Sequence, residues 1–151
     1  PISAITARAE VMDAAPAGTI GGTYCGNPLA CAAAIKTMEI MKVEDYCGKS
    51  MHIGKVVTEA FEKMKGKYSV IGDVRGLGGM IGVEFVKDKE SKEANPEFVK
   101  QLIQSALQKG LLLENAGSAG NVIRFLAPLC MTDEQMEAGL KIFEDAIIEN
   151  L

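Results

Sequence analysis

The residues best suited to chemistry lie at positions 21–27, in the run Gly-Gly-Thr-Tyr-Cys-Gly-Asn directly before an alanine-rich stretch. Glycines such as Gly22 and Gly26 let a ligand come close to the backbone. Thr23 adds a hydroxyl group beside the predicted start of a helix, where partial positive charge attracts anions. The pattern therefore indicates an anion site, and the alternative is a tight connection that binds nothing.

Arg124 is a second candidate, because it stands in the otherwise apolar, strand-like segment 122–129. A permanently charged guanidinium group in such a strand must either reach water or pair with an anion. Its planar fork of donors is suited to a carboxylate. Alternation of side chains along the strand also allows a plain outward-facing arginine, so at this level both interpretations remain open.

A helix that starts at Pro28 is expected to position the glycine-rich run. Asn27 can cap this helix with its side-chain oxygen, and proline suits the first helical position because its missing N–H would be unpaired there anyway. Apolar residues then follow at spacings of three and four as far as about Val43, which is typical of a helix with one apolar side. They are Leu29, Ala32, Ile35, Met38 and Ile40 or Met41.

Three segments carry a resemblance to a known family. Residues 22–33, Gly-Thr-Tyr-x-Gly-Asn-Pro-Leu-Ala-x-Ala-Ala, resemble a segment of the class III pyridoxal-phosphate aminotransferases, which include the 4-aminobutyrate, ornithine and acetylornithine enzymes. Residues 121–129 are similar to the family segment whose arginine binds the substrate's carboxylate. Residues 73–78, Asp-Val-Arg-Gly-x-Gly, are similar to the opening of the family's small C-terminal domain.

The resemblance implies an α/β protein, the C-terminal part of a fold-type I pyridoxal-phosphate transferase. Residues 1–44 would be the end of the large cofactor-binding domain with a linker helix. Residues 45–151 would be the small α+β domain, a mostly antiparallel sheet covered by helices. By the same resemblance, Thr23 with Gly22 would bind the phosphate of pyridoxal 5'-phosphate held by the neighbouring subunit of a homodimer with a shared active site. Arg124 would bind the substrate.

The implied reaction moves an amino group from an ω-amino acid, such as 4-aminobutyrate, to a 2-oxo acid such as 2-oxoglutarate. The family's Schiff-base lysine precedes the glycine-rich segment, whereas the first lysine here, Lys36, follows it. We therefore expect that lysine upstream, no catalytic residue in this chain, and no activity from the chain alone. Alternatives are another fold-type I enzyme (an aminomutase, racemase or decarboxylase) and a non-catalytic binding or oligomerisation module.

Composition limits the remaining possibilities. The 151 residues, 48% of them hydrophobic and 24% charged, suffice for one ordinary core. A net charge of −4 gives no case for nucleic acid, and no apolar run is long enough to predict a membrane span. The four cysteines form no C-x-x-C pair, and with His52 as the single histidine no metal site is expected. We expect His52 to be a surface or boundary residue and not a general base, and we expect free thiols in a reducing compartment, the cytoplasm.

The glycines at 76–79 do not form a dinucleotide-binding fingerprint, because Ile81 stands where the third glycine should be and a strand follows. A tight hairpin is expected there, with Arg75 structural or near the edge of the active site. Other elements follow from periodicity, caps and β-branched residues. They are a strand end and a short helix within 1–13, a helix from Asp45 to Lys65 stopped by Gly66, strands at 68–75 and 80–86, a helix from Pro96 to Gly110, strands at 111–113 and 121–126, and a helix after Thr132.

Overall fold

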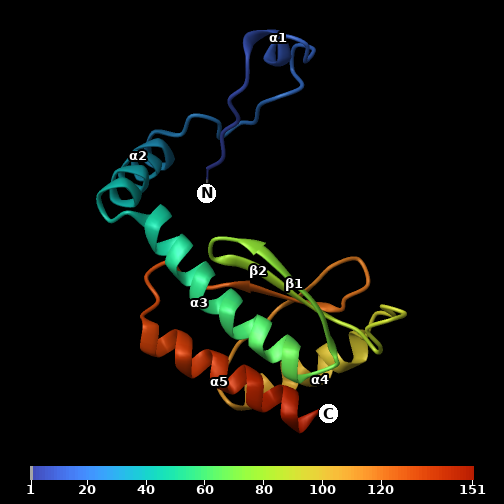
Figure 1. The fold of residues 1–151 in the computed structure, drawn as a ribbon. Coiled ribbons are helices and arrows are strands. Elements are labelled where there is room, and N and C mark those ends of the chain that lie inside the picture. Colours follow the sequence, from blue (N-terminus) through green and yellow to red (C-terminus); the bar gives the residue numbers. More distant parts are fainter. Residues whose placement is uncertain (1) are drawn as a thin grey trace. The chain divides into compact units, whose positions relative to one another are not determined.

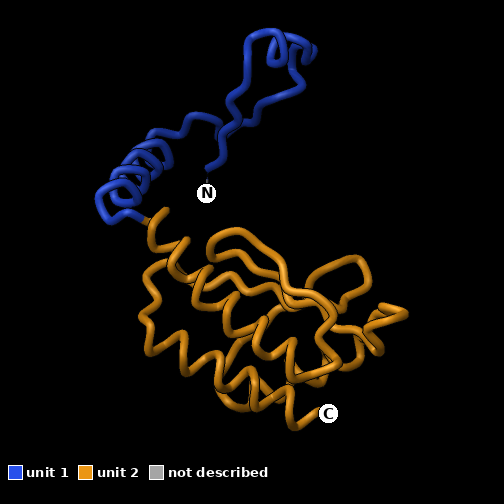
Figure 2. Tube along the Cα trace, in the orientation of Figure 1, with its two compact units in different colours: residues 1–45 blue, residues 46–151 orange. Residues whose placement is uncertain are grey.

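The structure, a computed structural model, describes residues 2–151 and divides between Asp45 and Tyr46 into two compact units (Figure 2). The first unit holds helices α1 (Ala9–Met12) and α2 (Pro28–Val43). The second holds α3 (Tyr46–Lys67), β1 (Ile71–Leu77), β2 (Met80–Phe85), α4 (Pro96–Gln108), β3 (Asn115–Ala116), β4 (Val122–Leu126) and α5 (Asp133–Glu149) (Figure 1). Within residues 2–151 no helix has the length and apolar character needed to cross a bilayer.

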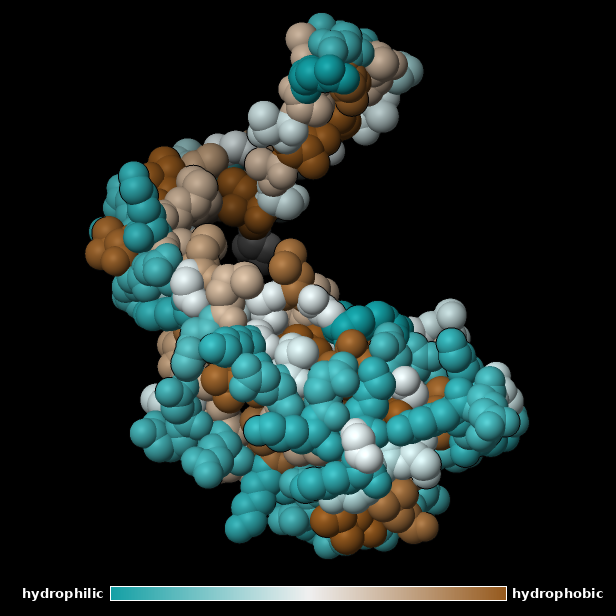
Figure 3. All heavy atoms as spheres, in the orientation of Figure 1, coloured by the Kyte–Doolittle hydropathy of each residue, from teal (hydrophilic) through white to brown (hydrophobic). Residues whose placement is uncertain are grey.

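The first unit has no buried residue in either helix. Apolar side chains of α2 are exposed, among them Leu29 and Met38, and Figure 3 shows hydrophobic surface on this unit. The strand expected before the short helix is wrong, because residues 2–8 form none. A strand needs a neighbour to take its hydrogen bonds, and the described sheet is built only from residues of the second unit.

The second unit is a two-layer α+β fold. Its four strands follow the order β1-β2-β4-β3, and each neighbouring pair is antiparallel. One face of the sheet packs against α3, α4 and α5, and together they enclose a single hydrophobic core. The prediction of an antiparallel sheet covered by helices is therefore confirmed for this unit. Ile81, Val83 and Phe85 alternate along β2 with more exposed neighbours and point into the core.

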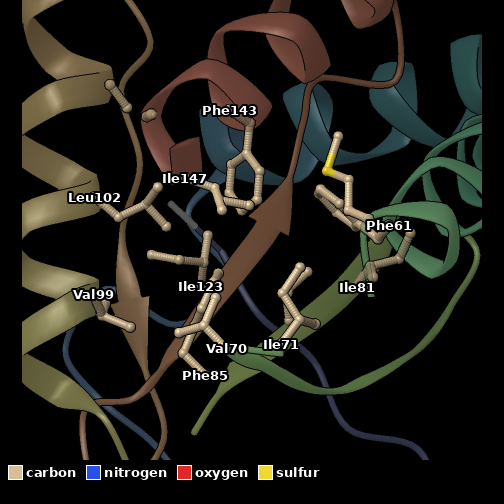
Figure 4. Packing of buried hydrophobic residues seen from close by; sticks show 14 of the residues in the cluster. Phe61, Val70, Ile71, Ile81, Phe85, Val99, Leu102, Ile123, Phe143 and Ile147 are labelled. Carbon is tan, nitrogen blue, oxygen red and sulfur yellow. The ribbon is translucent and has the colours of Figure 1, made fainter. Parts of the chain in front are cut away.

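Aromatic rings connect the helices to the sheet. The Phe61 ring of α3 lies 6.1 Å from the Phe125 ring of β4 and 5.0 Å from the Phe143 ring of α5. Figure 4 shows Phe61 and Phe143 converging on the strand residues from two helices. Burial of such rings contributes more to stability than burial of smaller side chains. Packing in the core holds the strands in place. The positions of the residues on the opposite face of the sheet are therefore defined as well.

The β1–β2 hairpin turns tightly against α3, as the glycines at 76–79 predict. Gly78 has φ +54°, a left-handed conformation that suits glycine. The Gly79 amide donates a hydrogen bond to Ser50 Oγ at 3.0 Å. A Cβ atom at Gly54 would lie 2.3 Å from the Gly78 carbonyl oxygen, so the helix approaches the turn at a position that only glycine permits.

Several expected boundaries are wrong. The strand expected at 68–75 forms at Ile71–Leu77, because residues 69 and 70 form a turn after α3. Gly66 lies inside α3, which continues to Lys67, because a glycine is tolerated in a helix at modest cost when the turn around it is otherwise well formed. The strand expected at 111–113 instead forms at Asn115–Ala116. Leu111 and Leu113 pack against the core, and hydrogen bonding to β4 starts only at Glu114.

Candidate functional site

The glycine-rich loop ends at a well-capped helix, as its sequence predicts. The Asn27 side-chain oxygen accepts hydrogen bonds from the backbone N–H groups of Leu29 at 3.0 Å and Ala30 at 3.2 Å. Pro28 occupies the first helical position. These contacts satisfy two of the donors that a helix start leaves unpaired, and they hold the loop at the positive end of the α2 dipole.

Thr23 lies at a hollow of about 880 Å³ within the first unit. The hollow is lined by residues 22–27 together with Ile2, Ser3, Leu29 and Ala30, and none of these side chains is a carboxylate. The Thr23 hydroxyl makes no hydrogen bond to another residue in the described range 2–151, so its proton is available to a ligand. A free hydroxyl donor, a helix start and the lack of acidic side chains together suit a phosphate group.

Arg124 lies on the sheet face opposite the helices. In β4, Ile123 points into the core and Arg124 is exposed, as alternation requires. Register places Gly82 of β2 directly beside Arg124, and Arg75 of β1 on the far side of Gly82. The two arginines therefore lie in one row, separated by a residue without a side chain.

Arg75 is held by two carboxylates. Its guanidinium donates to Asp73 at 2.8 Å and to Glu84 at 2.6 Å. The hydrogen bond from Arg75 keeps the pKa of Asp73 below its usual range, and its two acidic partners raise the pKa of Arg75. The contact with Glu84 connects β1 to β2, whereas Asp73 lies in β1 with Arg75, and this arrangement agrees with a structural role for Arg75.

Arg124 has a different environment. Its guanidinium donates to the Glu114 carboxylate, with Nη2 and Oε2 2.5 Å apart. The Arg124 side chain is 41% exposed and that of Glu114 is 71% exposed, so the pair is open to solvent and to ligands. Exposed pairs of this kind are weak. Arg124 can therefore exchange its partner for a ligand's carboxylate.

Sequence reasoning missed Glu114. The residue stands at the end of the apolar run 111–113, on the far side of a glycine-rich loop from Arg124. An acidic residue at the end of such a run predicts a pair with an arginine on the next strand only when the register of the two strands is known. Because the strand was expected at 111–113 and forms instead at Asn115–Ala116, the register that brings Glu114 opposite Arg124 could not be predicted.

Thr23 belongs to the first unit and Arg124 to the second. His52 is exposed, as expected, with Nε2 2.8 Å from Asp133 Oδ1 at the start of α5. All four cysteines are free. Across residues 2–151 no group of three or more His, Cys, Asp or Glu side chains is placed to hold a metal ion.

Comparison with known proteins supplies the context for these two sites. Residues 1–147 match the family described as aminotransferase class-III. A probable 4-aminobutyrate aminotransferase of Bacillus subtilis is 42% identical over 144 residues, covering 95% of this chain and 33% of the relative. A 5-aminovalerate aminotransferase of Pseudomonas putida is 41% identical over 149 residues, covering 99% of this chain and 35% of the relative. The chain thus spans about a third of the length of these curated relatives.

Solved structures agree on the fold. A Bacillus anthracis aminotransferase superposes with a TM-score of 0.79 at 28% identity, covering 85% of this chain and 30% of the other. An amine transaminase from an uncultivated Pseudomonas species, solved in its PLP-bound form, gives a TM-score of 0.79 at 29% identity and covers 88% of this chain and 30% of the other. The fold and the use of pyridoxal phosphate by such proteins agree with the resemblance in the sequence.

Proposed function

The chain belongs to the class III aminotransferase family, and we propose that it is part of a pyridoxal-phosphate enzyme that moves an amino group from an ω-amino acid to a 2-oxo acid. Arg124 carries this proposal. It stands on an open sheet face, beside Gly82 and with Glu114 as an exposed partner. An arginine in this position can bind the carboxylate at one end of a substrate while the amine at the other end reacts.

Thr23 and Gly22 are the proposed contacts of the cofactor phosphate. The Thr23 hydroxyl would donate to a phosphate oxygen, and Gly22 leaves room for the phosphate beside the backbone. Pyridoxal phosphate, when bound, supplies an aldehyde that accepts the amine and a ring that withdraws electrons from the reacting carbon. We propose that Thr23 serves the active site of the neighbouring subunit in a homodimer, and that the Schiff-base lysine lies outside this chain.

The relatives support donors such as 4-aminobutyrate and 5-aminovalerate, which are named in their descriptions. Both donors have a carboxylate at one end and the amine at the other. With the carboxylate on Arg124, the length of the carbon chain decides where the amine lies. We propose 2-oxoglutarate as the acceptor, because it also presents a carboxylate at the end away from its reacting carbon. The free thiols support a cytoplasmic location, since unpaired cysteines persist in a reducing compartment.

The test uses the full-length protein that contains this chain, loaded with pyridoxal phosphate. We expect a visible absorbance band that disappears when 4-aminobutyrate or 5-aminovalerate is added without an oxo acid, and that returns with 2-oxoglutarate. The R124Q variant should keep the band and raise KM for the donor. A protein that binds no cofactor would instead favour the binding module, for which the exposed apolar side chains of α2, such as Leu29 and Met38, are the supporting observation.

A further inference from the structure

Asn121 is the one polar side chain that is buried among residues 2–151, with 5% of its surface exposed. It stands three residues before Arg124, where the chain enters β4. We propose that Asn121 is a positioning residue, whose side-chain amide fixes the register of β4 on β2 and so places Arg124 beside Gly82. This inference rests on the proposed function, because it takes Arg124 as the contact of the substrate's carboxylate.

Two hydrogen bonds join Asn121 to Phe85, the last residue of β2. The Phe85 backbone N–H donates to the Asn121 carbonyl oxygen at 2.8 Å, and Asn121 Nδ2 donates to the Phe85 carbonyl oxygen at 2.9 Å. In a regular antiparallel pair, opposite residues exchange such bonds through their backbones alone. Here the Asn121 side chain supplies one of the two, so this contact depends on the residue type at position 121.

Asn121 lies on the core face of the sheet. Side chains alternate along a strand, so Asn121 shares a face with the fully buried Ile123, and Arg124 lies on the opposite face. Figure 4 shows Ile123 and Phe85 together in the core. A buried amide without a partner destabilises the fold. The Phe85 carbonyl oxygen is therefore the contact that allows a polar side chain at this position.

Apolar alternation alone does not determine this register. A shift of β4 by one residue would turn Ile123 out of the core, but a shift by two would keep the faces and move Arg124 by about 7 Å along β2. After either shift by two, the Asn121 amide would lose the Phe85 carbonyl oxygen, because it would lie deeper in the core or beyond the end of β2. Asn121 thus favours the register in which Arg124 lies opposite Gly82.

The other side of β4 is held by a short ladder. The β3 strand comprises only Asn115–Ala116, and one further backbone hydrogen bond runs from the Arg124 N–H to the Glu114 carbonyl oxygen at 3.2 Å. The loop that leads into β4 contains Gly117 at φ +81° and Gly120 at φ +65°, and glycines leave such a loop more conformational freedom than other residues. The contact with β2 at the end of this loop is therefore important for where β4 starts.

The variant N121L separates positioning from stability. Leucine has nearly the same shape as asparagine and lacks the amide. The Phe85 carbonyl oxygen keeps the backbone N–H of Asn95 as a donor, at 3.1 Å, so no buried acceptor is left unpaired. Replacement of a buried polar group by an apolar group of the same shape is nearly neutral or stabilising. We therefore expect the free energy of unfolding to be at least as large as in the wild type.

The kinetic test compares 4-aminobutyrate with butylamine in the full-length enzyme loaded with pyridoxal phosphate. Butylamine has a methyl group where 4-aminobutyrate has its carboxylate, so the ratio of the two kcat/KM values measures the contact with the carboxylate. N121L should lower this ratio about fivefold, the effect of one hydrogen bond. A purely structural defect would lower kcat/KM for both donors by the same factor. A donor that is not turned over is measured by the rate at which it removes the cofactor's absorbance band.

The matched control is N150L. The Asn150 amide donates to Ser105 Oγ at 2.9 Å and to the Ala146 carbonyl oxygen at 2.7 Å, which joins α5 to α4, and N150L should leave the ratio unchanged. N121A lacks the amide without adding bulk, and it repeats the test if leucine does not fit.

The outcomes distinguish the inference from the proposed function. If N121L and N121A leave the ratio unchanged, or if neither variant folds, the inference about Asn121 is wrong, and the proposed function stands as long as R124Q lowers the ratio. If R124Q leaves the ratio unchanged, the substrate role of Arg124 is wrong, and the inference falls with it.

Discussion

Arg75 and Arg124 flank Gly82 in one row of the sheet, on the face opposite α3, α4 and α5, yet their partners differ. Arg75 donates to two carboxylates, Asp73 and Glu84. Arg124 pairs with one, Glu114, among the described residues. Arginine at position 75 thus connects two strands, whereas arginine at position 124 remains available to a ligand.

The variants R75A and R124A should separate these roles. Without Arg75, the carboxylates of Asp73 and Glu84 lose their shared cation, and we expect the free energy of unfolding to fall by about 1 kcal/mol. Without Arg124, it should change by less than about 0.5 kcal/mol, while KM for the donor rises. Denaturant unfolding and steady-state kinetics of the full-length protein measure both effects. An R124A variant less stable than R75A would contradict the assignment.

Gly54 and Gly66 provide a matched pair within α3. G54A places a Cβ atom 2.3 Å from the Gly78 carbonyl oxygen, and the resulting shift of helix or hairpin should cost about 2 kcal/mol of stability. G66A meets nothing within 4 Å and should stabilise the protein by about 0.5 kcal/mol or more, because alanine favours the helix. Thermal melting distinguishes the two variants, because the melting temperature should fall for G54A and rise for G66A. Equal effects would mean that α3 does not approach the hairpin this closely.

Acid should weaken the contact between α3 and α5. Glu144 accepts hydrogen bonds from Lys67 and from Tyr68, both at 2.9 Å. The Lys67 hydrogen bond is the larger cause that lowers the pKa of Glu144, followed by that of Tyr68. The folded state therefore holds this proton less readily than the unfolded state. The contribution is complete above the unfolded pKa of about 4.3 and is lost as the pH falls through the lower folded pKa.

The variant E144Q checks this pH dependence. Since glutamine does not titrate, the loss of stability in denaturant unfolding between neutral pH and about pH 3 should be smaller in E144Q than in wild type. D145N on the same helix is the control. A slope with pH that E144Q leaves unchanged would exclude Glu144 as a source of the acid effect.

Much of this architecture could be predicted because its signals are local. Asn27 and Pro28 mark the start of α2, and Thr132 forms a capping box with Gln135 at the start of α5. The row of Arg75, Gly82 and Arg124 could not be predicted, because strand register is set by packing between segments far apart in the chain. The same holds for Glu114, whose partner lies ten residues away across a loop.

Some errors have equally physical causes. Helical spacing alone would also allow Leu107 to face inward, yet Leu107 is exposed, because the buried side of α4 is filled by Val99, Leu102 and Ala106. The apolar side of α2 was predicted from spacing, but spacing does not tell what covers it. Its side chains are exposed in the first unit.

Thr23 and Thr19 test the proposed phosphate contact. Both threonines are exposed, but the Thr19 hydroxyl already donates to the Pro16 carbonyl oxygen at 2.7 Å. T23A should weaken the binding of pyridoxal phosphate about tenfold, the effect of one hydrogen bond to a charged group, whereas T19A should not. Fluorescence titration of the apoprotein with cofactor measures both. Equal affinities would remove Thr23 from the cofactor site.

The most direct test combines T23A and R124Q in one dimer. If Thr23 serves the neighbouring subunit's active site while Arg124 serves its own, a heterodimer of the two variants contains one site with both native residues. Two affinity tags allow that heterodimer to be purified, and turnover is assayed at cofactor and donor concentrations where neither variant homodimer is active. The account predicts that the heterodimer regains turnover. A heterodimer as inactive as the two homodimers would contradict it.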